Sequence, residues 1–557
     1  LSTLYGEEVK TQVEPFLRTL IDGKFLLSNL TLPVTGLEMI EYLHEQLHRL
    51  TPVPAVTRIL DLVATDNNQP VQLLSKTVTT ALAETTQEEK PLLTPVLQTD
   101  LFFFPEALSV SESLINKLGA QFHGLLPLLT FVRQSPLQSF KNRFINRYDK
   151  QEIDLMTALD TEIGVGFSID TLPLHPELVA LGFSEPMTSV SKSDTLDTLR
   201  EIVYSRYILT GEREVELTET DLDTLTGLEP AGNLPPSWYL HGELYTVPKA
   251  NHFPETASVP QENGDESTVR FALNSMAGAS AASLLGRFCH GHPPLRNAVQ
   301  QLCAWEQAQY PDELLAEIVH LPLKPETAGN VVTRPVLRPY EIPYISPPAV
   351  DHEHTIPLSD IVVSVSDSGQ LLLRSKRTGQ RIRPRHSSAH NPVLGDEVYQ
   401  FLALVQLEES DSIGWSWRSL SQLPSLPRLI YKNVILCPAQ WTIKKENLPT
   451  PKNVTIDRLI RSYNLPRYVY LVESDNKLLL DLTFLPAQEI LLDEIQKQEK
   501  VLLKEWLGEQ HELWLKSNTD HYASELIIPM TSKAEISPLK WSVPPAYDPT
   551  GASEPGQ

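Results

Sequence analysis

The stretch from Ile361 to Asn391 constrains the fold more than any other part of the chain, because it has the pattern of a β-meander. Extended runs alternate with turn signals of the kind that joins antiparallel strands. The runs are 361–365, 371–376 and 381–385, and the turn signals are Asp367-Ser368-Gly369 and Thr378-Gly379. The sequence therefore predicts three antiparallel strands in succession.

This meander is basic, since no Asp or Glu occurs within residues 371–391 although the chain has a formal net charge of −24. Side chains alternate between the two faces of a strand. The basic side chains then form two sets, each on one face: Arg374 with Lys376, and Arg381 with Arg383 and Arg385. One interpretation is a solvated edge guarded by charge. The other is an anion-binding platform, because guanidinium groups bind carboxylates and phosphates through paired hydrogen bonds.

Length and charge set limits on the whole chain. At 557 residues it is too long for one ordinary domain, so two or three subdomains are expected. No apolar run of transmembrane length and no signal-peptide pattern is present, which predicts a cytoplasmic protein without membrane insertion. Three widely spaced cysteines favour idle thiols in a reducing compartment over a disulfide framework. The acidic net charge disfavours long-range attraction of nucleic acid, so RNA contact requires a local basic patch such as the meander.

Periodicity and turn signals predict an α+β fold with antiparallel meanders covered by helices, in two or three packed lobes. The Pro-, Asn- and Glu-rich segment 247–267 predicts a linker between a first lobe, 36–246, and a second lobe, 268–532, while the Pro-rich tail 533–557 predicts disorder. Helices are predicted at 7–22, 37–50, 110–132, 194–207, 297–309, 398–407 and 488–508. Extended segments are predicted at 93–104, 269–273, 317–321, 330–333 and 429–436, and a pair of strands that turns at 474–476 is predicted at 468–480.

Two interpretations remain open for each of several polar residues. Asp100 enters an apolar strand, either as a solvated strand end or as a general base. Arg287 follows the small-residue run 276–283, where a buried guanidinium requires a partner, so it forms a structural salt bridge or binds a ligand. Asn330 caps a turn or binds a peptide backbone or a ribose.

Arg143 and Arg147 are four residues apart and therefore share a face if their segment is helical. They are an exposed pair or part of a binding site, and the Gly164-Val165-Gly166 turn that follows suits close approach of the backbone.

Known catalytic motifs are absent from the sequence. It holds no G-x-x-x-x-G-K-[ST] loop, no G-x-S-x-G elbow, no H-E-x-x-H and no paired C-x-x-C. Two H-x-H pairs, at 290–292 and 352–354, fall short of a closed metal site, so no metal is predicted. The sequence therefore shows no means of activating a carboxylate with ATP.

Segments in order along the chain carry a family resemblance. They are FKNRFINRYDKQEIDLMTALDTEIGVGF at 140–167, LLGRFCHG at 284–291, GNVVTRPVLRPYEIPY at 329–344, LRSKRTGQRIRPRHSSAHN at 373–391 and HYASELIIPM at 521–530. Together they resemble the class I lantibiotic (lanthipeptide) dehydratases, in the large N-terminal glutamylation domain. The resemblance implies transfer of glutamate from glutamyl-tRNA, a co-substrate, onto Ser or Thr side chains of a ribosomally made precursor peptide with a leader. It implies no bound cofactor, a homodimer, and a separate elimination protein or cyclase as further partner.

The resemblance also implies roles for individual residues. Arg287 contributes to glutamate transfer, and Asp100 takes the hydroxyl proton, with His390 as the alternative base because of its intrinsic pKa. A basic set holds the glutamyl carboxylate and stabilises the oxyanion: Arg374, Lys376, Arg383 and Arg385, with Arg334 in support. Further substrate-binding candidates are Asn330, Arg143 and Arg147.

The chain departs from the family pattern at both ends. Residues 1–35 resemble only the tail of the winged-helix element that grips the leader, and the chain begins with Leu1, which leads us to expect a truncated or processed N-terminus. The chain also stops where the elimination domain would begin. It is then a fragment, the glutamylating half of a split dehydratase, or a related peptide aminoacyl-tRNA ligase that uses ATP. An alternative from another functional class is a non-catalytic scaffold that binds the precursor peptide.

Overall fold

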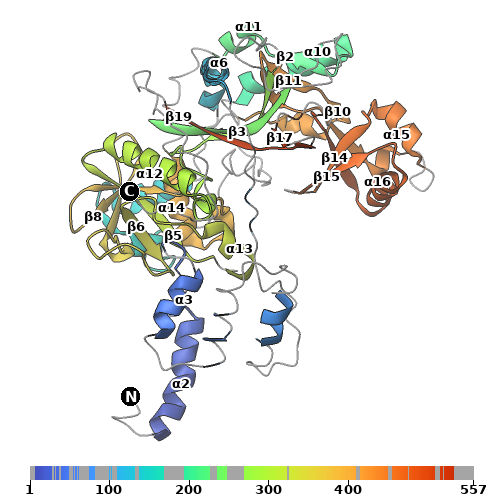
Figure 1. Cartoon of the computed structure of the whole chain (residues 1–557). Helices are drawn as coiled ribbons and strands as arrows, with labels where there is room; N and C mark the ends of the chain where they lie inside the picture. The colour runs from blue at the N-terminus through green and yellow to red at the C-terminus, as the bar shows by residue number, and fades with distance from the viewer. Residues whose placement is uncertain are drawn as a thin grey trace, which may run out of the picture.

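Figure 1 shows the structure, a computed structural model of the whole chain. Among the described residues, three sheets of five or more strands each have their own apolar core. The described residues are 7–27, 31, 33–36, 39–48, 54, 57–58, 61, 75–81, 100, 102, 110–131, 137–167, 193–225, 235–246, 269–322, 325–408, 414–448, 454–473, 476–508, 513, 515–517 and 520–531.

The first sheet contains the predicted meander, and we call it the meander sheet. Its strand order is β1-β7-β8-β9-β5-β6. The strands are β1 (Ile153–Asp154), β5 (Glu313–His320), β6 (Tyr340–Tyr344), β7 (Ile361–Val365), β8 (Leu371–Ser375) and β9 (Arg381–Arg385). The β7, β8 and β9 strands run antiparallel in succession, so the predicted meander is confirmed. The β5 strand pairs in parallel with both β9 and β6, which makes the sheet mixed.

Helices cover one face of the meander sheet: α7 (Gln138–Tyr148), α8 (Leu155–Leu159) and α14 (Glu397–Leu407). Phe140, Phe167 and Phe401 form an aromatic cluster between α7, α14 and the loop after α8, with ring centroids 5.0–6.1 Å apart. The α12 helix (Pro293–Ala308) contacts β5 and contributes to a separate small core with the segment after β4. The β5 strand is buried over nearly its whole length, as expected for a central parallel strand.

The second sheet has the order β19-β3-β4-β12-β11-β2. Its strands are β2 (Glu214–Glu216), β3 (Ser237–Thr246), β4 (Val269–Ala277), β11 (Arg428–Tyr431), β12 (Val434–Cys437) and β19 (Leu526–Thr531). The helices α6 (Glu112–Gly124) and α10 (Ser193–Thr210) contribute Leu118, Phe122 and Val203 to its core. The predicted linker 247–267 joins the neighbouring strands β3 and β4 and itself lies outside the described residues.

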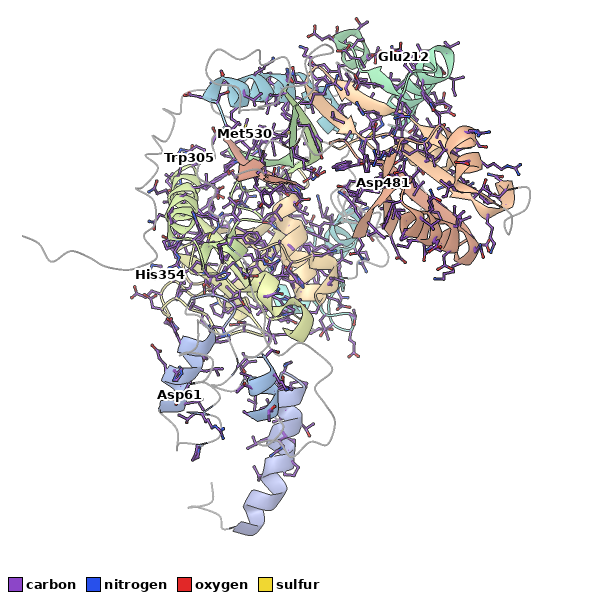
Figure 2. The ribbon with its side chains drawn as sticks, turned by 45° about the vertical axis from the view of Figure 1, so that its right-hand side comes forward. Asp61, Glu212, Trp305, His354, Asp481 and Met530 are labelled. Carbon is purple, nitrogen blue, oxygen red and sulfur yellow. The ribbon has the colours of Figure 1, made fainter. Side chains whose placement is uncertain are left out.

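The third sheet has the order β10-β13-β16-β14-β15. Its strands are β10 (Ser425–Leu426), β13 (Gln440–Lys444), β14 (Tyr468–Glu473), β15 (Asn476–Asp481) and β16 (Lys500–Glu505). The helices α15 (Ile456–Tyr463) and α16 (Leu485–Lys497) contribute to its core. This sheet lies at the right in Figure 1, and Figure 2 labels Asp481 on it. Figure 2 also labels Trp305 on α12, His354 near the meander sheet, and Met530 on β19 of the second sheet.

A buried chain of charges links the second sheet to the meander sheet. Glu306 on α12 accepts hydrogen bonds from Ser237 on β3 at 2.6 Å and from Arg338 at 2.5 Å. Arg338 Nε lies 3.4 Å from an oxygen of Glu317 on β5, and Glu317 pairs with Arg334 at 2.7 Å. All four charged side chains are at most 3% exposed. Because each buried charge is next to an opposite one, the network fixes how α12, β5 and the 334–338 segment meet.

Two N-terminal helices, α2 (Glu7–Asp22) and α3 (Met39–His48), extend away from the sheets in Figure 1. The segment between them joins the meander sheet, since Arg334 donates its backbone N–H to the Val34 carbonyl and accepts from Gly36 N–H, both at 3.0 Å. The winged-helix character of residues 1–35 stays a prediction. Among the described residues, no helix combines the length and apolarity that crossing a bilayer requires.

The mixed α+β class is confirmed, but three element predictions are wrong. Residues 330–333 are not extended, because Asn330 lies in α13 (Pro325–Val332), which Pro325 opens. The predicted helix 488–508 ends at Lys497, and residues 500–505 form β16, whose burial alternates as in a strand. The predicted strand 429–436 is a hairpin of β11 and β12. The predicted strand 93–104 lies outside the described residues except at Asp100 and Phe102, and the tail 533–557 lies wholly outside them.

Candidate functional site

A partly exposed polar cluster brings together Asp100, Arg287 and His290. Arg287 Nη2 lies 3.4 Å from Asp100 Oδ1, and His290 Nε2 lies 3.3 Å from Asp100 Oδ2. The side chains of Asp100, Arg287 and His290 are 19%, 25% and 24% exposed. His290 Nδ1 donates to the Arg287 carbonyl at 2.5 Å, and its Nε2 faces the carboxylate. The carboxylate of Asp100 therefore lies between the Arg287 guanidinium and the His290 imidazole, and all three side chains are partly exposed.

Aromatic rings border this cluster. The Phe102 and His290 rings meet edge to face at 5.8 Å, and the Arg287 guanidinium lies 5.3 Å from the centre of the Phe288 ring. The Phe288 side chain is 44% exposed. Arg287 Nε, in contrast, is a buried donor that has no hydrogen-bond acceptor within the described structure. A buried donor without an acceptor costs free energy, so this atom is suited to an acceptor supplied by a ligand.

The local fold places Arg287 on a short 3₁₀ turn, Gly286–Cys289, after the small-residue run. Gly286 leaves no room for a side chain: a Cβ there would lie 2.9 Å from both Arg334 Cδ and Ser387 Oγ. Its backbone N–H donates to the Ser387 carbonyl at 3.0 Å. Arg287 is thus attached directly to the segment that follows the basic meander.

Below this contact, Arg334 and Glu317 form a buried pair. Arg334 donates to Glu317 Oε1 through Nε at 3.0 Å and through Nη2 at 2.7 Å. The same oxygen accepts from the Ser387 backbone N–H at 2.8 Å and from its hydroxyl at 2.7 Å. Arg334 also donates to the carbonyls of Val332 and Ile318. Through this one oxygen, Glu317 connects β5 both to Arg334 and to the segment after β9.

His390 lies in a buried cluster of imidazoles around one tyrosine. The Tyr399 hydroxyl is 2.7 Å from His386 Nε2 and 3.2 Å from His390 Nδ1, and the His320 ring stacks on Tyr399 at 4.1 Å. Burial, and then the neighbouring His320, lower the pKa of His390 to about 4. Burial, followed by Arg334 and the other two imidazoles, lowers the pKa of His386 well below its usual value. Both imidazoles are therefore neutral at pH 7.

The remaining basic residues of the meander do not converge on one ligand position. Arg374 pairs with Glu152 at 3.0 Å and Lys376 with Asp154 at 2.9 Å, all on exposed side chains. Arg383 pairs with Glu313 and lies 4.1 Å from the centre of the Tyr310 ring. Alternation does put Arg381, Arg383 and Arg385 on one face, but the paired residues of β5, Glu313 to Glu317, bring carboxylates to that same face.

Arg385 lies at the inner end of the meander, 1% exposed, and its Nη1 donates to the Pro384 carbonyl at 2.9 Å. Arg385 is therefore buried like Arg334 and Glu317, whereas the ion pairs of Arg374 and Lys376 are exposed. The predicted basic platform is divided between a buried end and a solvated end.

Arg143 and Arg147 do share a face of α7, as predicted, and both bind the glycine turn. Arg147 donates to the carbonyls of Gly164 at 2.6 Å and Ile163 at 2.8 Å, and Arg143 donates to that of Gly166 at 3.2 Å. Arg147 also lies 5.3 Å from the centre of the Tyr148 ring. The contacts that the structure describes for both arginines are therefore with the protein's own backbone and with this ring, and their role in substrate binding stays a prediction.

Sequence reasoning missed three residues of the site: Glu317, Ser387 and His290 as a neighbour of Asp100. His290 was noted only as half of an H-x-H pair, and His292 in fact caps α12 by accepting from the Leu295 N–H at 3.0 Å. An isolated Glu on a strand, or an isolated Ser just after one, gives no signal of its own. No group of three or more His, Cys, Asp or Glu side chains is arranged to hold a metal ion in the described part of the chain.

Comparison with known proteins decides the family. The family model described as "Lantibiotic dehydratase, N terminus" matches residues 2–491. The chain belongs to this family. The resemblance seen in the sequence motifs is thereby confirmed.

Curated members of the lantibiotic dehydratase family are distant in sequence. The subtilin biosynthesis protein SpaB of Bacillus subtilis is 22% identical over 97% of this chain and 52% of its own length. The nisin biosynthesis protein NisB of Lactococcus lactis subsp. lactis is 24% identical over 89% of this chain and 48% of its own length. The chain thus spans about half the length of these relatives.

Solved structures of the family share the fold. The tRNA-dependent lantibiotic dehydratase MibB from Microbispora sp. 107891 aligns with a TM-score of 0.69 at 18% identity, over 93% of this chain and 50% of that one. The glutamylation domain of TbtB, from thiomuracin biosynthesis, aligns with a TM-score of 0.56 at 16% identity, over 95% of this chain and 62% of that one. The same TbtB domain has been solved with bound 5′-phosphodesmethylglutamycin.

Proposed function

We propose that this chain transfers glutamate from glutamyl-tRNA to Ser or Thr hydroxyls of a ribosomally made precursor peptide. The observation that carries the proposal is the arrangement of Asp100, Arg287 and His290, with the buried Arg287 Nε lacking an acceptor within the described structure. Family membership and the fold shared with the TbtB glutamylation domain and with tRNA-dependent MibB support it.

Transfer of the glutamyl group requires three functions of the protein. The Ser or Thr oxygen attacks the carbonyl carbon of the glutamyl ester, the bond to the ribose oxygen breaks, and the hydroxyl proton ends on the leaving ribose oxygen. The protein must hold the glutamyl group and stabilise the oxyanion, and a general base must take the hydroxyl proton and pass it to the leaving ribose oxygen.

In this proposal Arg287 binds the glutamyl group and stabilises the oxyanion, and Asp100 is the general base. Asp100 is within reach of solvent, and His290 Nε2 at 3.3 Å orients its second oxygen. His390 is 5% exposed and directs Nδ1 to the Tyr399 hydroxyl, so we assign it a positioning role behind the site. Arg334 and Arg385 are both nearly fully buried, so we assign neither a contact with the substrate. Arg334 shares Glu317 Oε1 with Ser387 and so supports the segment that carries Ser387.

The exposed end of the meander suits the tRNA backbone. The pairs of Arg374 with Glu152 and of Lys376 with Asp154 are solvated, and such pairs contribute little stability, so a phosphate can displace the carboxylates. Because the chain's net charge is −24, this contact is local and depends on salt concentration.

The test uses the full chain, glutamyl-tRNA labelled in the glutamate, and the precursor peptide encoded beside its gene. Transfer of label to the peptide supports the proposal. Peptide binding without transfer, in a preparation that still unfolds cooperatively, contradicts it and supports the non-catalytic scaffold. Binding of 5′-phosphodesmethylglutamycin is measured in parallel, because that compound occupies the TbtB glutamylation domain.

A further inference from the structure

The His290 imidazole faces the backbone with one nitrogen and Asp100 with the other. Its Nδ1 lies 2.5 Å from the carbonyl oxygen of Arg287, and a carbonyl oxygen is only an acceptor, so Nδ1 carries a hydrogen. Its Nε2 lies 3.3 Å from Asp100 Oδ2. A carboxylate oxygen is also an acceptor, so this second contact is favourable only with a proton between the two atoms. His290 and Asp100 therefore share one proton.

Packing holds both sides of this contact. Arg296 on α12 donates to the His290 carbonyl at 3.2 Å, which fixes the backbone of the turn. A Cβ at Gly291 would overlap the Phe102 ring, so the segment that carries Asp100 packs directly on the residue after His290. The Phe102 and His290 rings also meet edge to face. The carboxylate and the imidazole are therefore kept side by side, although they are far apart in the sequence.

The shared proton is within reach of a bound substrate. The Asp100 and His290 side chains are both partly exposed. A charge-assisted hydrogen bond between nitrogen and oxygen is usually about 2.7–2.9 Å long, so at 3.3 Å the Nε2 atom is held loosely and its hydrogen can turn to another acceptor. Arg287 Nη2 lies 3.4 Å from the other oxygen of Asp100. An acyl group bound by Arg287 therefore lies next to both members of the pair.

We propose that His290 is the proton donor to the leaving ribose oxygen, and that it passes on the proton that Asp100 takes from the Ser or Thr hydroxyl. This role rests on the proposed function, in which His290 only orients Asp100. As the hydroxyl oxygen bonds to the ester carbon, its proton moves to Asp100. As the bond to the ribose oxygen breaks, the Nε2 proton moves to that oxygen. The proton on Asp100 then moves to Nε2, so the pair ends with the proton that it had at the start.

The leaving group offers a direct way to isolate this step. A ribose oxygen leaves poorly unless it is protonated. A thiolate leaves without protonation, because a thiol is a far stronger acid than a ribose hydroxyl. Two donors are therefore compared: glutamyl-tRNA, and the same tRNA with sulfur in place of the ester oxygen of its terminal ribose. Loss of a proton donor should slow transfer from the oxygen ester and spare transfer from the thioester.

The test is the single-turnover rate of transfer from both donors by the full chain with His290→Gln. The glutamine amide reaches the position of Nε2 and still donates to Asp100, so the orienting contact remains while the proton donor is lost. Transfer from the oxygen ester should fall about 10²–10⁴-fold, the usual contribution of general acid–base catalysis, and transfer from the thioester should keep most of its rate. Equal losses with the two donors, or undiminished transfer from the oxygen ester, overturn the proposal.

His290→Asn is the second variant, for use if the first folds poorly. The asparagine amide reaches the position of Nδ1 and keeps the hydrogen bond to the Arg287 carbonyl, so it supports the turn from the other side. It should show the same difference between the two donors, and a folded His290→Asn without that difference contradicts the proposal. His352→Gln, at an exposed position, is the matched control and should leave both rates unchanged.

Asp100→Asn separates the base from the proton donor. Because the base acts on the attacking hydroxyl, its loss should slow transfer from both donors alike. A thioester rate that falls in Asp100→Asn and persists in His290→Gln is the result expected here. Failure of the proposed function has a different signature, since the unsubstituted chain then transfers label from neither donor, which overturns both proposals.

Discussion

The backbone N–H of Gly286 donates to the carbonyl oxygen of Ser387 at 3.0 Å. This bond ties the turn that carries Arg287 to the segment that leaves the basic meander, 101 positions later in the sequence. The proposed acyl site therefore depends on a contact between backbones, and the side chains of Arg334 and Glu317 lie directly beneath it.

Gly286→Ala should distort this contact. A Cβ at this position would meet Arg334 and Ser387 at about van der Waals overlap, 2.9–3.0 Å, so Arg287 must move. We expect a loss of about 1–3 kcal/mol in the free energy of unfolding and a lower rate of transfer. Gly329→Ala, in α13 with no atom within 4 Å of the added Cβ, should leave both unchanged or slightly raise stability. Equal effects in chemical denaturation would contradict the account.

Glu317→Ala should be strongly destabilising. It removes the acceptor of two Arg334 hydrogen bonds and of both Ser387 donors, and it leaves Arg334 charged and buried. Breaking one side of such a buried pair costs about 3–5 kcal/mol. Glu152→Ala, which removes an exposed partner of Arg374, should cost under about 1 kcal/mol. Urea unfolding of both variants measures the difference, and similar costs would refute the buried-network description.

The histidine cluster should make stability depend on pH. Burial holds the pKa of His390 at about 4, against an ordinary value of 6.5. Between pH 4 and pH 6.5 the unfolded chain therefore binds more protons at this residue than the folded chain does. The stabilisation of the neutral form is complete above about pH 6.5 and is lost as the pH falls toward 4, by at most about 3 kcal/mol for this residue. His390→Asn should flatten the pH profile of the melting temperature, whereas His352→Asn, at an exposed position, should not. An unchanged profile in His390→Asn would show that its burial has no such effect.

Arg147→Ala should affect stability rather than substrate binding. Its two donors hold the Ile163 and Gly164 carbonyls, and loss of such charged hydrogen bonds costs about 1–3 kcal/mol. Arg458→Ala, at an exposed position on α15, should cost under about 0.5 kcal/mol. A large rise in the KM for glutamyl-tRNA, with stability unchanged, would instead restore the substrate-binding interpretation.

Local signals in the sequence predicted local structure well. The turns at Asp367-Ser368-Gly369 and Thr378-Gly379 define the meander because hairpin geometry depends on a few adjacent residues. The 500–505 strand was missed because its charged, apolar pattern continues that of α16 and fits either element over so short a stretch.

The site was predictable only in part. Arg287 stood out because an arginine after a close-packed run needs a partner, and Asp100 because it enters an apolar segment. The buried pairing of Arg334 with Glu317 could not be foreseen, since it depends on β5 lying in parallel between β6 and β9, a long-range arrangement with no local signal. For the same reason the outer arginines looked like one platform until β5 and the β1 segment supplied their carboxylates.

The most direct test of the account is the single-turnover rate of labelled glutamate transfer in Arg287→Ala compared with Arg374→Ala. Removing one charged group that stabilises a developing oxyanion costs about 10²–10³ in rate, so Arg287→Ala should lose about that factor while folding normally. Arg374→Ala, whose partner is the exposed Glu152, should keep its maximal rate and show mainly a weaker dependence on salt. Undiminished transfer by Arg287→Ala would contradict the placement of the acyl site at Asp100, Arg287 and His290.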